Sequence, residues 1–216
     1  MLSCSFRRRA RTLPGALAPF PLLALLAPFA PLAPFAPLAP IMPLRIEDYG
    51  LIGDTQTAAL VGRDGSIDWL CLPRFDAGAC FAALLGEPAN GRWLLAPVEG
   101  GNARHRRYRG DSLVLEQEFH ASTGTVRIVD CMPPRQREPD VVRVVEGVSG
   151  HVDMQMELIV RFDYGHIVPW VRALDGVWHA VAGPDALSLW TPVPTHGVNL
   201  TTRAEFTVRA GERVPF

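Results

Sequence analysis

From Leu44 onward the chain consists of short apolar runs separated by turn residues, and this pattern restricts the fold more than any other feature. Two runs, 57–61 and 66–72, flank Asp64-Gly65, a dipeptide typical of a tight hairpin turn. The other runs of strand length are 92–98, 112–121, 125–132, 141–148, 152–162, 168–174, 177–182, 186–191 and 204–208. Many short strands joined by turns predict a mainly β protein, an antiparallel two-sheet β-sandwich.

Among these runs, 152–162 shows the clearest alternation of apolar and polar residues. Its apolar side chains alternate strictly with polar ones over most of its length, which predicts a half-buried strand with one wet face. The dipeptide Ser149-Gly150 precedes it and follows another apolar run, 141–148. We therefore expect these two runs to pair as a hairpin around Ser149-Gly150.

One segment, 76–85, predicts a short helix. Asp76 can cap its N-terminus and Gly86 can end it. In the run 125–132 the apolar side chains do not alternate strictly, so they do not all fall on one face of the strand. We interpret this as a β-bulge near Asp130.

Residues 1–43 have a different composition from the rest of the chain. They hold nine of the twenty prolines, four arginines and no acidic residue, and from Ala27 they read APFAPLAPFAPLAP. Proline at this spacing excludes a continuous helix and so a transmembrane helix. Three interpretations are a secretory signal, a polyproline-like tail, and translated upstream sequence with the true start at Met42. We favour the third and expect this Pro/Ala-rich leader to be disordered.

The organised region is then 44–216. Its last residues, 211–216, predict a turn and the beginning of another strand, so we expect a domain truncated at its C-terminal end.

Composition narrows the functional classes. All 21 basic residues are arginine, which excludes a Schiff-base lysine and a P-loop lysine, and the net charge of −1 gives no attraction to nucleic acid. The one basic cluster, 104–109, is interpreted as an exposed connection. Four cysteines without CxxC spacing favour a reduced, cytoplasmic protein, with secretion through the leader as the alternative. We expect no cofactor, nucleic-acid or membrane partner.

Glycoside hydrolysis needs two carboxylates across a cleft, and three pairs are conceivable on spacing. They are Glu116 with Glu118, Asp64 with Asp68, and Glu47 with Asp48. Acids on strand faces are usually solvated and acids in hairpins usually form turn hydrogen bonds, so we assign no catalytic residue. The six histidines lack the spacing of a metal motif, so no metal ligand is assigned either.

The segment WLCLPRFD holds the best candidates for recognition of a ligand. Trp69 offers a flat face for a sugar ring, and Arg74 and Asp76 offer hydrogen-bond partners for hydroxyl groups. The alternative is that Trp69 belongs to the core and that Arg74 and Asp76 form a structural ion pair.

Four stretches carry a resemblance to a known family: IEDYGLIGDTQTAALVGRDGSIDWLCLPRFDAGACFAALLG, RRYRGDSLVLEQEF, TGTVRIVDCMPP and VVRVVEGVSGHVDMQMELIVRFDYG. In this order, over residues 45–216, they resemble the N-terminal domain of glycoside hydrolase family 15, in its bacterial trehalase-like and glucoamylase-like branch. The leader has no counterpart in that family, which supports the start at Met42.

The resemblance implies a β-sandwich that precedes an (α/α)6 barrel. In the family, two glutamates of that barrel hydrolyse α-glucosides such as trehalose or α-1,4-glucans with inversion, and no position of this chain matches them. The resemblance therefore implies a non-catalytic domain whose partner is the barrel and whose possible ligand is trehalose or another α-glucoside. Two alternatives are a free-standing carbohydrate-binding sandwich and a degraded gene product without function.

Overall fold

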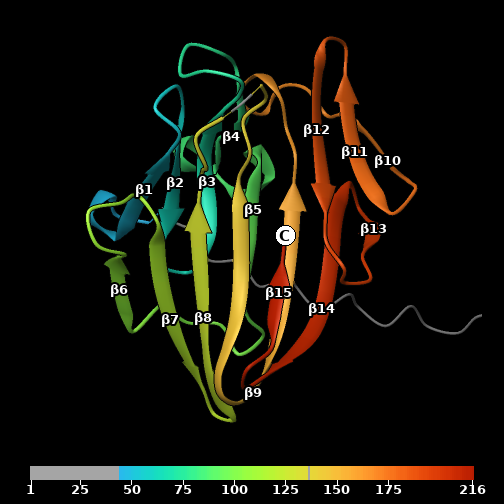
Figure 1. Cartoon of the computed structure of the whole chain (residues 1–216). Helices are drawn as coiled ribbons and strands as arrows, with labels where there is room; N and C mark the ends of the chain where they lie inside the picture. The colour runs from blue at the N-terminus through green and yellow to red at the C-terminus, as the bar shows by residue number, and fades with distance from the viewer. Residues whose placement is uncertain (1–43, 136) are drawn as a thin grey trace, which may run out of the picture. The chain divides into compact units, whose positions relative to one another are not determined.

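A computed structural model of the chain describes residues 44–135 and 137–216, so the expectations for the leader 1–43 fall outside the described residues. The described part is mainly β, as predicted, with fifteen strands and four single-turn 3-10 helices (Figure 1). The helical turns are η1 Ile46–Asp48, η2 Ala83–Leu85, η3 Pro88–Asn90 and η4 Asp163–Gly165. The strands are β1 Tyr49–Gly53, β2 Ala58–Gly62, β3 Ser66–Cys71, β4 Ala79–Phe81, β5 Arg92–Pro97, β6 His105–Tyr108, β7 Leu115–Ala121, β8 Gly124–Cys131, β9 Val142–Ile159, β10 Trp170–Leu174, β11 Val177–Ala182, β12 Asp185–Trp190, β13 His196–Val198, β14 Thr201–Arg209 and β15 Arg213–Pro215.

The strands form two antiparallel layers, which confirms the predicted sandwich (Figure 1). The front layer contains β6, β7, β8, the first half of β9, and β15. The rear layer contains β1, β2, β3 with β4 beside it, β5, the second half of β9, β14 and β13. A separate meander of β10, β11 and β12 stands beside them.

Strand β9 corrects the predicted hairpin around Ser149-Gly150. It is one strand of 18 residues that passes from the front layer to the rear layer. Gly150 has a φ of +61°, and a Cβ there would meet the carbonyl oxygen of Thr123 at 2.2 Å. The dipeptide therefore bends the strand instead of reversing it, because each half of β9 finds its partners in a different sheet.

The predicted helix over 76–85 is also wrong in its main part. This segment forms strand β4, which pairs with β3, and only η2 is helical. Gly86 ends η2, as expected for the end of a helix. Pairing with β3 buries Ala79 and Phe81, so burial in the sheet outweighs the helix propensity of the alanines and leucines.

The predicted irregularity of β8 exists but lies elsewhere. The register between β8 and β9 shifts between Thr125 and Val126, whereas Asp130 stands in regular register with both neighbouring strands. The apolar pattern looked broken because Asp130 occupies an inward position, where it pairs with a buried arginine, Arg143.

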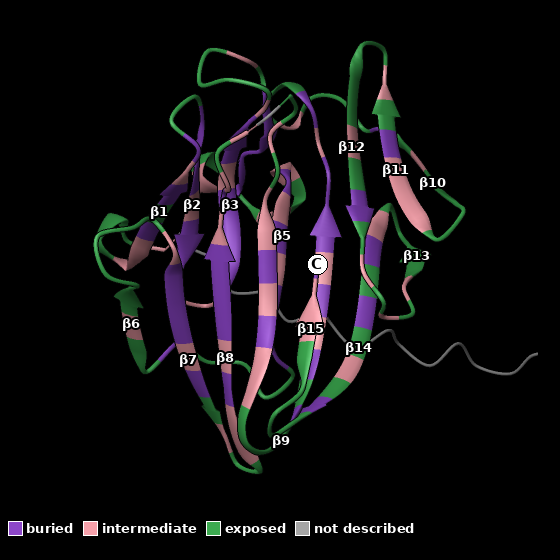
Figure 2. Ribbon diagram, viewed as in Figure 1, coloured by how far each residue is buried: buried purple, intermediate pink, exposed green. Residues whose placement is uncertain are grey.

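The core lies between the two layers. Figure 2 shows buried residues along much of β7, β8 and β9. The alternation predicted for 152–162 is confirmed, since Met154 and Met156 are fully buried while Asp153 is exposed. Burial of such side chains supplies about 1.5–3 kcal/mol each and is the main force that holds the layers together.

Candidate functional site

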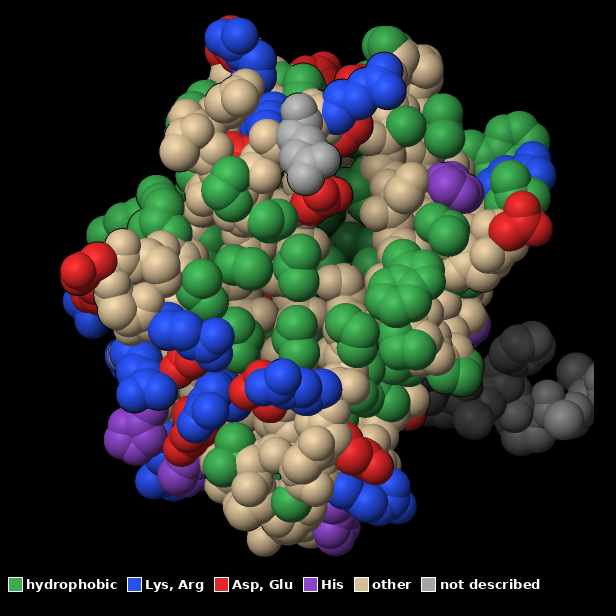
Figure 3. Space-filling view, in the orientation of Figure 1, with side chains coloured by type: hydrophobic (Ala, Val, Ile, Leu, Met, Phe, Trp, Pro, Cys, Tyr) green, Lys and Arg blue, Asp and Glu red, His purple; other side chains and the backbone are tan. Residues whose placement is uncertain are grey.

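A groove of about 730 Å³ lies between the β10–β12 meander and the sandwich. We call it the aromatic groove. Five aromatic side chains line it, from β4, β5, the segment after β9, β12 and the last residue of the sequence: Phe81, Trp93, Phe162, Trp190 and Phe216. Figure 3 shows a hollow flanked by apolar side chains on this face. A cavity of this size and lining is typical of a site for a small molecule or a polypeptide segment.

Polar groups also line the aromatic groove. Glu138, Asp140 and Asp185 provide three carboxylates. Trp93, of which only 6% is exposed, has an indole N–H with no hydrogen-bond acceptor among the described residues. The guanidinium of Arg143 covers the Trp93 ring at 5.2 Å. The indole N–H is itself buried, so the polar groups that an occupant of the groove could reach are the three carboxylates.

The predicted recognition residues Trp69, Arg74 and Asp76 do not line this groove, although they are close in the sequence to residues that do. Leu72 and Pro73 form part of its wall and directly precede Arg74. Arg74 and Asp76 form an exposed ion pair with Nε 3.0 Å from Oδ1, and this arginine lowers the pKa of Asp76.

Trp69 has a different environment. Its ring lies 6.0 Å from the ring of Tyr164 in η4, and it packs against the small buried cluster of Cys71, Ala79 and Ala82. A ligand-binding role for Trp69, Arg74 and Asp76 stays a prediction.

The carboxylate pair Glu116 and Glu118 is held by ion pairs. Glu116 is buried and accepts hydrogen bonds from Arg107 and Arg109 at 2.8 and 2.6 Å. Burial alone would raise the pKa of Glu116, but these two arginines outweigh it and hold the pKa below its usual range. Such a carboxylate stays ionised and is suited to a structural role.

The pair Asp64 and Asp68 likewise has structural partners. Asp64 accepts hydrogen bonds from the backbone N–H and hydroxyl of Ser66 at 3.0 and 2.7 Å, which is the turn role expected of a hairpin acid. Asp68 is buried and accepts a hydrogen bond from the Tyr49 hydroxyl at 2.7 Å. Burial, with repulsion from Asp64, raises the pKa of Asp68.

The third pair, Glu47 and Asp48, lies in η1. Arg45 pairs with Glu47 at 3.0 Å, and Arg106 donates to the backbone carbonyls of Glu47 and Asp48. Asp48 also faces Arg63 at 3.9 Å. Each carboxylate considered from the sequence is therefore engaged in an ion pair, a turn or a tyrosine hydrogen bond.

A ladder of charged side chains crosses the outer face of the front layer, and we call it the charged ladder. It runs from β7 through β8 and β9 to β15, with N–O separations of 3.0, 3.4, 3.8 and 2.8 Å: His120, Glu118, Arg127, Glu146 and Arg213. Figure 3 shows these charge types gathered as a band across the lower part of this face. Exposed pairs of this kind contribute about 0–1 kcal/mol each, so we attribute to the ladder a role in shaping the surface rather than in stability.

Two histidines that show no metal-motif spacing in the sequence, His105 and His120, lie close together at one end of the charged ladder. The potential metal-ligating atoms of His105, Glu118 and His120 all lie within 4.8 Å of one another. Sequence reasoning missed this cluster because His105 lies on a different strand. The spacing of Glu118 and His120, two residues apart on one strand face, is the only local signal.

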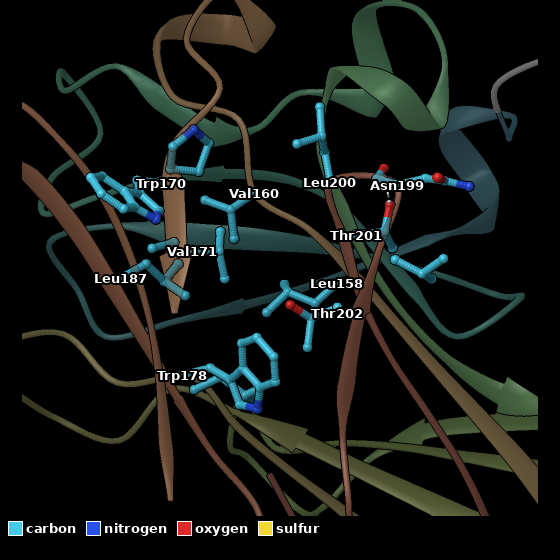
Figure 4. Close-up of a pocket in the computed structure, with 15 residues that line it drawn as sticks. Leu158, Val160, Trp170, Val171, Trp178, Leu187, Asn199, Leu200, Thr201 and Thr202 are labelled. Atoms are coloured by element: carbon cyan, nitrogen blue, oxygen red, sulfur yellow. Dashed lines mark hydrogen bonds between the residues drawn. The ribbon is translucent and has the colours of Figure 1, made fainter. Parts of the chain in front are cut away.

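A second cavity, of about 460 Å³, lies between the meander and the β13–β14 hairpin. Figure 4 shows Trp170, Trp178 and Leu187 on one side of it and Leu200 on the other. Trp170 is 78% exposed and Leu200 is 67% exposed. This cavity is apolar and presents few groups that could carry chemistry.

Two further findings concern the environment of the chain. In residues 44–135 and 137–216 no helix is long and apolar enough to cross a membrane. The cysteines of this part, Cys71, Cys80 and Cys131, are free thiols, and burial raises the pKa of each.

Comparison with known proteins identifies the family. The chain matches the family described as "Trehalase-like, N-terminal" over residues 38–210. The chain therefore belongs to the trehalase-like N-terminal domain family. No solved structure matches it.

Similar curated proteins are trehalases by name. A trehalase of Mycolicibacterium smegmatis is 32% identical over 141 residues, which cover 56% of this chain and 21% of that protein. A trehalase of Mycobacterium tuberculosis is 30% identical over 157 residues, covering 63% and 23%. Trehalase 1 of Sulfolobus acidocaldarius is 32% identical over 154 residues, covering 70% and 26%. The chain thus spans about a fifth to a quarter of the length of these relatives.

Proposed function

We propose that residues 44–216 are the N-terminal β-sandwich domain of a trehalase-type protein of glycoside hydrolase family 15. The domain supports a catalytic (α/α)6 barrel that lies outside this chain, and that barrel hydrolyses the α-glucosidic bond. The observation that carries the proposal is the family match over 38–210 together with relatives named trehalases that are four to five times as long as the matched part.

The partners of the carboxylates are consistent with a domain that has no catalytic residues of its own. An inverting glycosidase needs a carboxylic acid and a carboxylate about 6.5–9.5 Å apart on opposite sides of a sugar. Glu116 is paired with two arginines, Glu118 lies between Arg127 and His120, and Asp68 is bound to Tyr49.

The aromatic groove is the face that we propose for docking of the barrel. Trp190 is 57% exposed at this groove, and large exposed apolar patches usually mark interaction sites. The relatives' unmatched length, about three quarters of each protein, supplies an occupant of the required size.

This docking is tested by adding the remainder of Trehalase 1 of Sulfolobus acidocaldarius, without its matched region, to the purified chain and measuring binding by calorimetry. We expect a complex that Trp190→Ser weakens by about tenfold or more, as for a central interface residue. The matched control is Trp170→Ser, which removes an exposed tryptophan outside the aromatic groove and should have little effect. No complex between two folded components, or equal effects of both substitutions, would contradict the proposal.

A second candidate function is carbohydrate binding by the domain itself. The observation in its favour is the chemistry of the aromatic groove, where the exposed Trp190 ring and three carboxylates line the same cavity. Titration with trehalose and maltose, followed by tryptophan fluorescence, tests it. Binding that Asp185→Asn weakens would favour this function, because Asp185 is an exposed carboxylate of the groove, and an unchanged spectrum would count against it.

The cellular location that we propose is the cytoplasm. Three free cysteines among the described residues support a reducing compartment. Secretion would predict removal of the leader, so the N-terminal residue of the protein purified from its own cells distinguishes the two. A start at Met42 supports the cytoplasmic proposal, and a chain shortened by cleavage at any other position in or after the leader contradicts it.

A further inference from the structure

The histidine cluster at the end of the charged ladder has the composition of a metal site. His105 stands on β6 directly opposite Glu118 of β7, and His120 lies two residues further along β7 on the same face. The His120 Nε2 atom is 3.0 Å from Glu118 Oε1, and the two imidazole rings lie 6.0 Å apart at a tilt of 58°. We propose that His105, Glu118 and His120 bind a divalent transition metal ion of the zinc type.

The geometry of the cluster suits such an ion. Zinc bonds of about 2.0–2.2 Å to nitrogen and oxygen place neighbouring ligand atoms about 3.4 Å apart in a tetrahedron. The three ligand atoms already lie within 4.8 Å of one another, and His105 and His120 are exposed, so their rings have room to turn. Two imidazoles and one carboxylate leave the fourth position to water, as in known His2Glu zinc sites.

The donor set also selects among ions. Imidazole nitrogens suit zinc, nickel and copper, whereas magnesium and calcium require a shell of oxygen atoms. We therefore expect Zn²⁺ to bind and Mg²⁺ not to compete with it. The bond between His120 and Glu118 would be replaced by two bonds to a shared ion.

Arg127 is positioned to orient the carboxylate. Its Nη2 lies 3.4 Å from Glu118 Oε2, which leaves Oε1 directed at the histidines. Outer partners of this kind fix the orientation of a metal ligand. The other nearby arginines have partners of their own, since Arg106 donates to the carbonyl of Glu47 and Arg107 to the carboxylate of Glu116. Both arginines line the same cavity as His105 and Glu118, and these partners engage their guanidinium groups.

The structural consequence concerns β6. This strand has four residues and pairs only with β7 within the described residues. An ion held by His105 from β6 and by Glu118 and His120 from β7 would cross-link the two strands. Ligand binding to the folded state alone raises stability, so we expect Zn²⁺ to raise the melting temperature.

The test is titration of the purified, chelator-treated full chain with Zn²⁺ by calorimetry, with Mg²⁺ as the comparison ion. We expect His105→Ala and His120→Ala each to weaken one Zn²⁺ site by about tenfold or more. The matched control is His196→Ala, an exposed histidine of β13 outside the cluster, which should leave that site unchanged. Circular dichroism without metal should give the same melting temperature for all variants, because the three histidines are exposed.

Failure of Zn²⁺ to bind to the unmodified chain would overturn the proposal. So would a site whose affinity is the same in His105→Ala and His120→Ala as in the unmodified chain, because the ion would then lie elsewhere. Neither result bears on the proposed docking of a barrel, which is measured with different variants.

Discussion

Arg143 and Asp130 form an ion pair inside the sandwich, with Nε 2.8 Å from Oδ1 and neither side chain exposed. They stand opposite each other on β9 and β8 of the front layer. The same guanidinium donates to the carbonyl oxygens of Trp93 and Gly65, each at 2.7 Å. One side chain therefore joins the front layer to the part of the rear layer that forms the wall of the aromatic groove.

Arg143→Met should destabilise the fold by about 3–5 kcal/mol, because it leaves the Asp130 carboxylate buried without a partner. The measurement is the free energy of unfolding in urea. The double variant Arg143→Met/Asp130→Leu should recover part of this loss, since it removes both charges. A double variant no more stable than the single one would show that the charge of Asp130 is not the source of the cost.

Asp68→Asn should stabilise the domain at neutral pH. Burial, with repulsion from Asp64, raises the pKa of Asp68 above its ordinary value of 3.8. A raised folded-state pKa means that the fold favours the protonated carboxyl, so stability is lost as pH rises from 3.8 through the folded pKa. Asparagine avoids this ionisation and can still accept the hydrogen bond of the Tyr49 hydroxyl.

The advantage of Asp68→Asn should therefore be present at about pH 8 and vanish at about pH 3, where the native carboxyl is also neutral. Melting temperatures across this range measure it. A variant that is destabilised at about pH 8, or whose advantage grows toward acid pH, would contradict the assigned environment of Asp68.

Asp54 should show the opposite dependence on pH. Burial opposes its ionisation, but hydrogen bonds from Arg135 and from the backbone N–H groups of Thr57 and Gln56 outweigh burial and lower its pKa. Its stabilising contribution is thus present above the unfolded value near 3.8 and is lost as pH falls through the lower folded pKa. Asp54→Asn should lower the melting temperature at about pH 7 and lose this effect in acid. An effect independent of pH would contradict this account.

Gly150→Ala should lower the free energy of unfolding more than Gly183→Ala does, because Gly150 forms the bend of β9. Gly150 and Gly183 have φ values of +61° and +60°, so both substitutions carry the strain of a left-handed backbone, about 1 kcal/mol. Only at Gly150 would the new Cβ meet backbone, the Thr123 carbonyl oxygen at 2.2 Å, whereas nothing lies within 4 Å at Gly183. Unfolding free energies should show a clearly larger loss for Gly150→Ala, and equal losses would contradict the bend.

Local turn chemistry explains which elements could be predicted. Asp64-Gly65 determines its hairpin because Gly65 has a φ of +87° and Asp64 binds the following serine, and both properties belong to those residues. Ser149-Gly150 carries the same kind of signal, yet it bends a continuous strand. Whether such a dipeptide reverses the chain depends on partners such as β14, which lie far away in the sequence.

The helix predicted over 76–85 failed for a related reason. Its alanines and leucines favour a helix in isolation, but β3 offers a partner edge and a buried face to Ala79 and Phe81. Tertiary burial of this kind leaves no local mark in the sequence.

The candidate sites were harder to predict than the strands. The aromatic groove combines residues from β4, β5 and β12 with the C-terminal Phe216, and the histidine cluster joins β6 to β7. The sequence directed attention to Trp69, Arg74 and Asp76 because they share one segment. Sites assembled from several strands become visible only when the pairing of those strands is known.

The central claim is that this domain supports a hydrolase and does not itself break the glycosidic bond. The most direct test is release of glucose from trehalose and from maltose by the purified chain alone. The account predicts release no greater than that of a blank without protein. Turnover well above that blank, reduced by substitution of a carboxylate such as Glu138 or Asp185 of the aromatic groove, would contradict it.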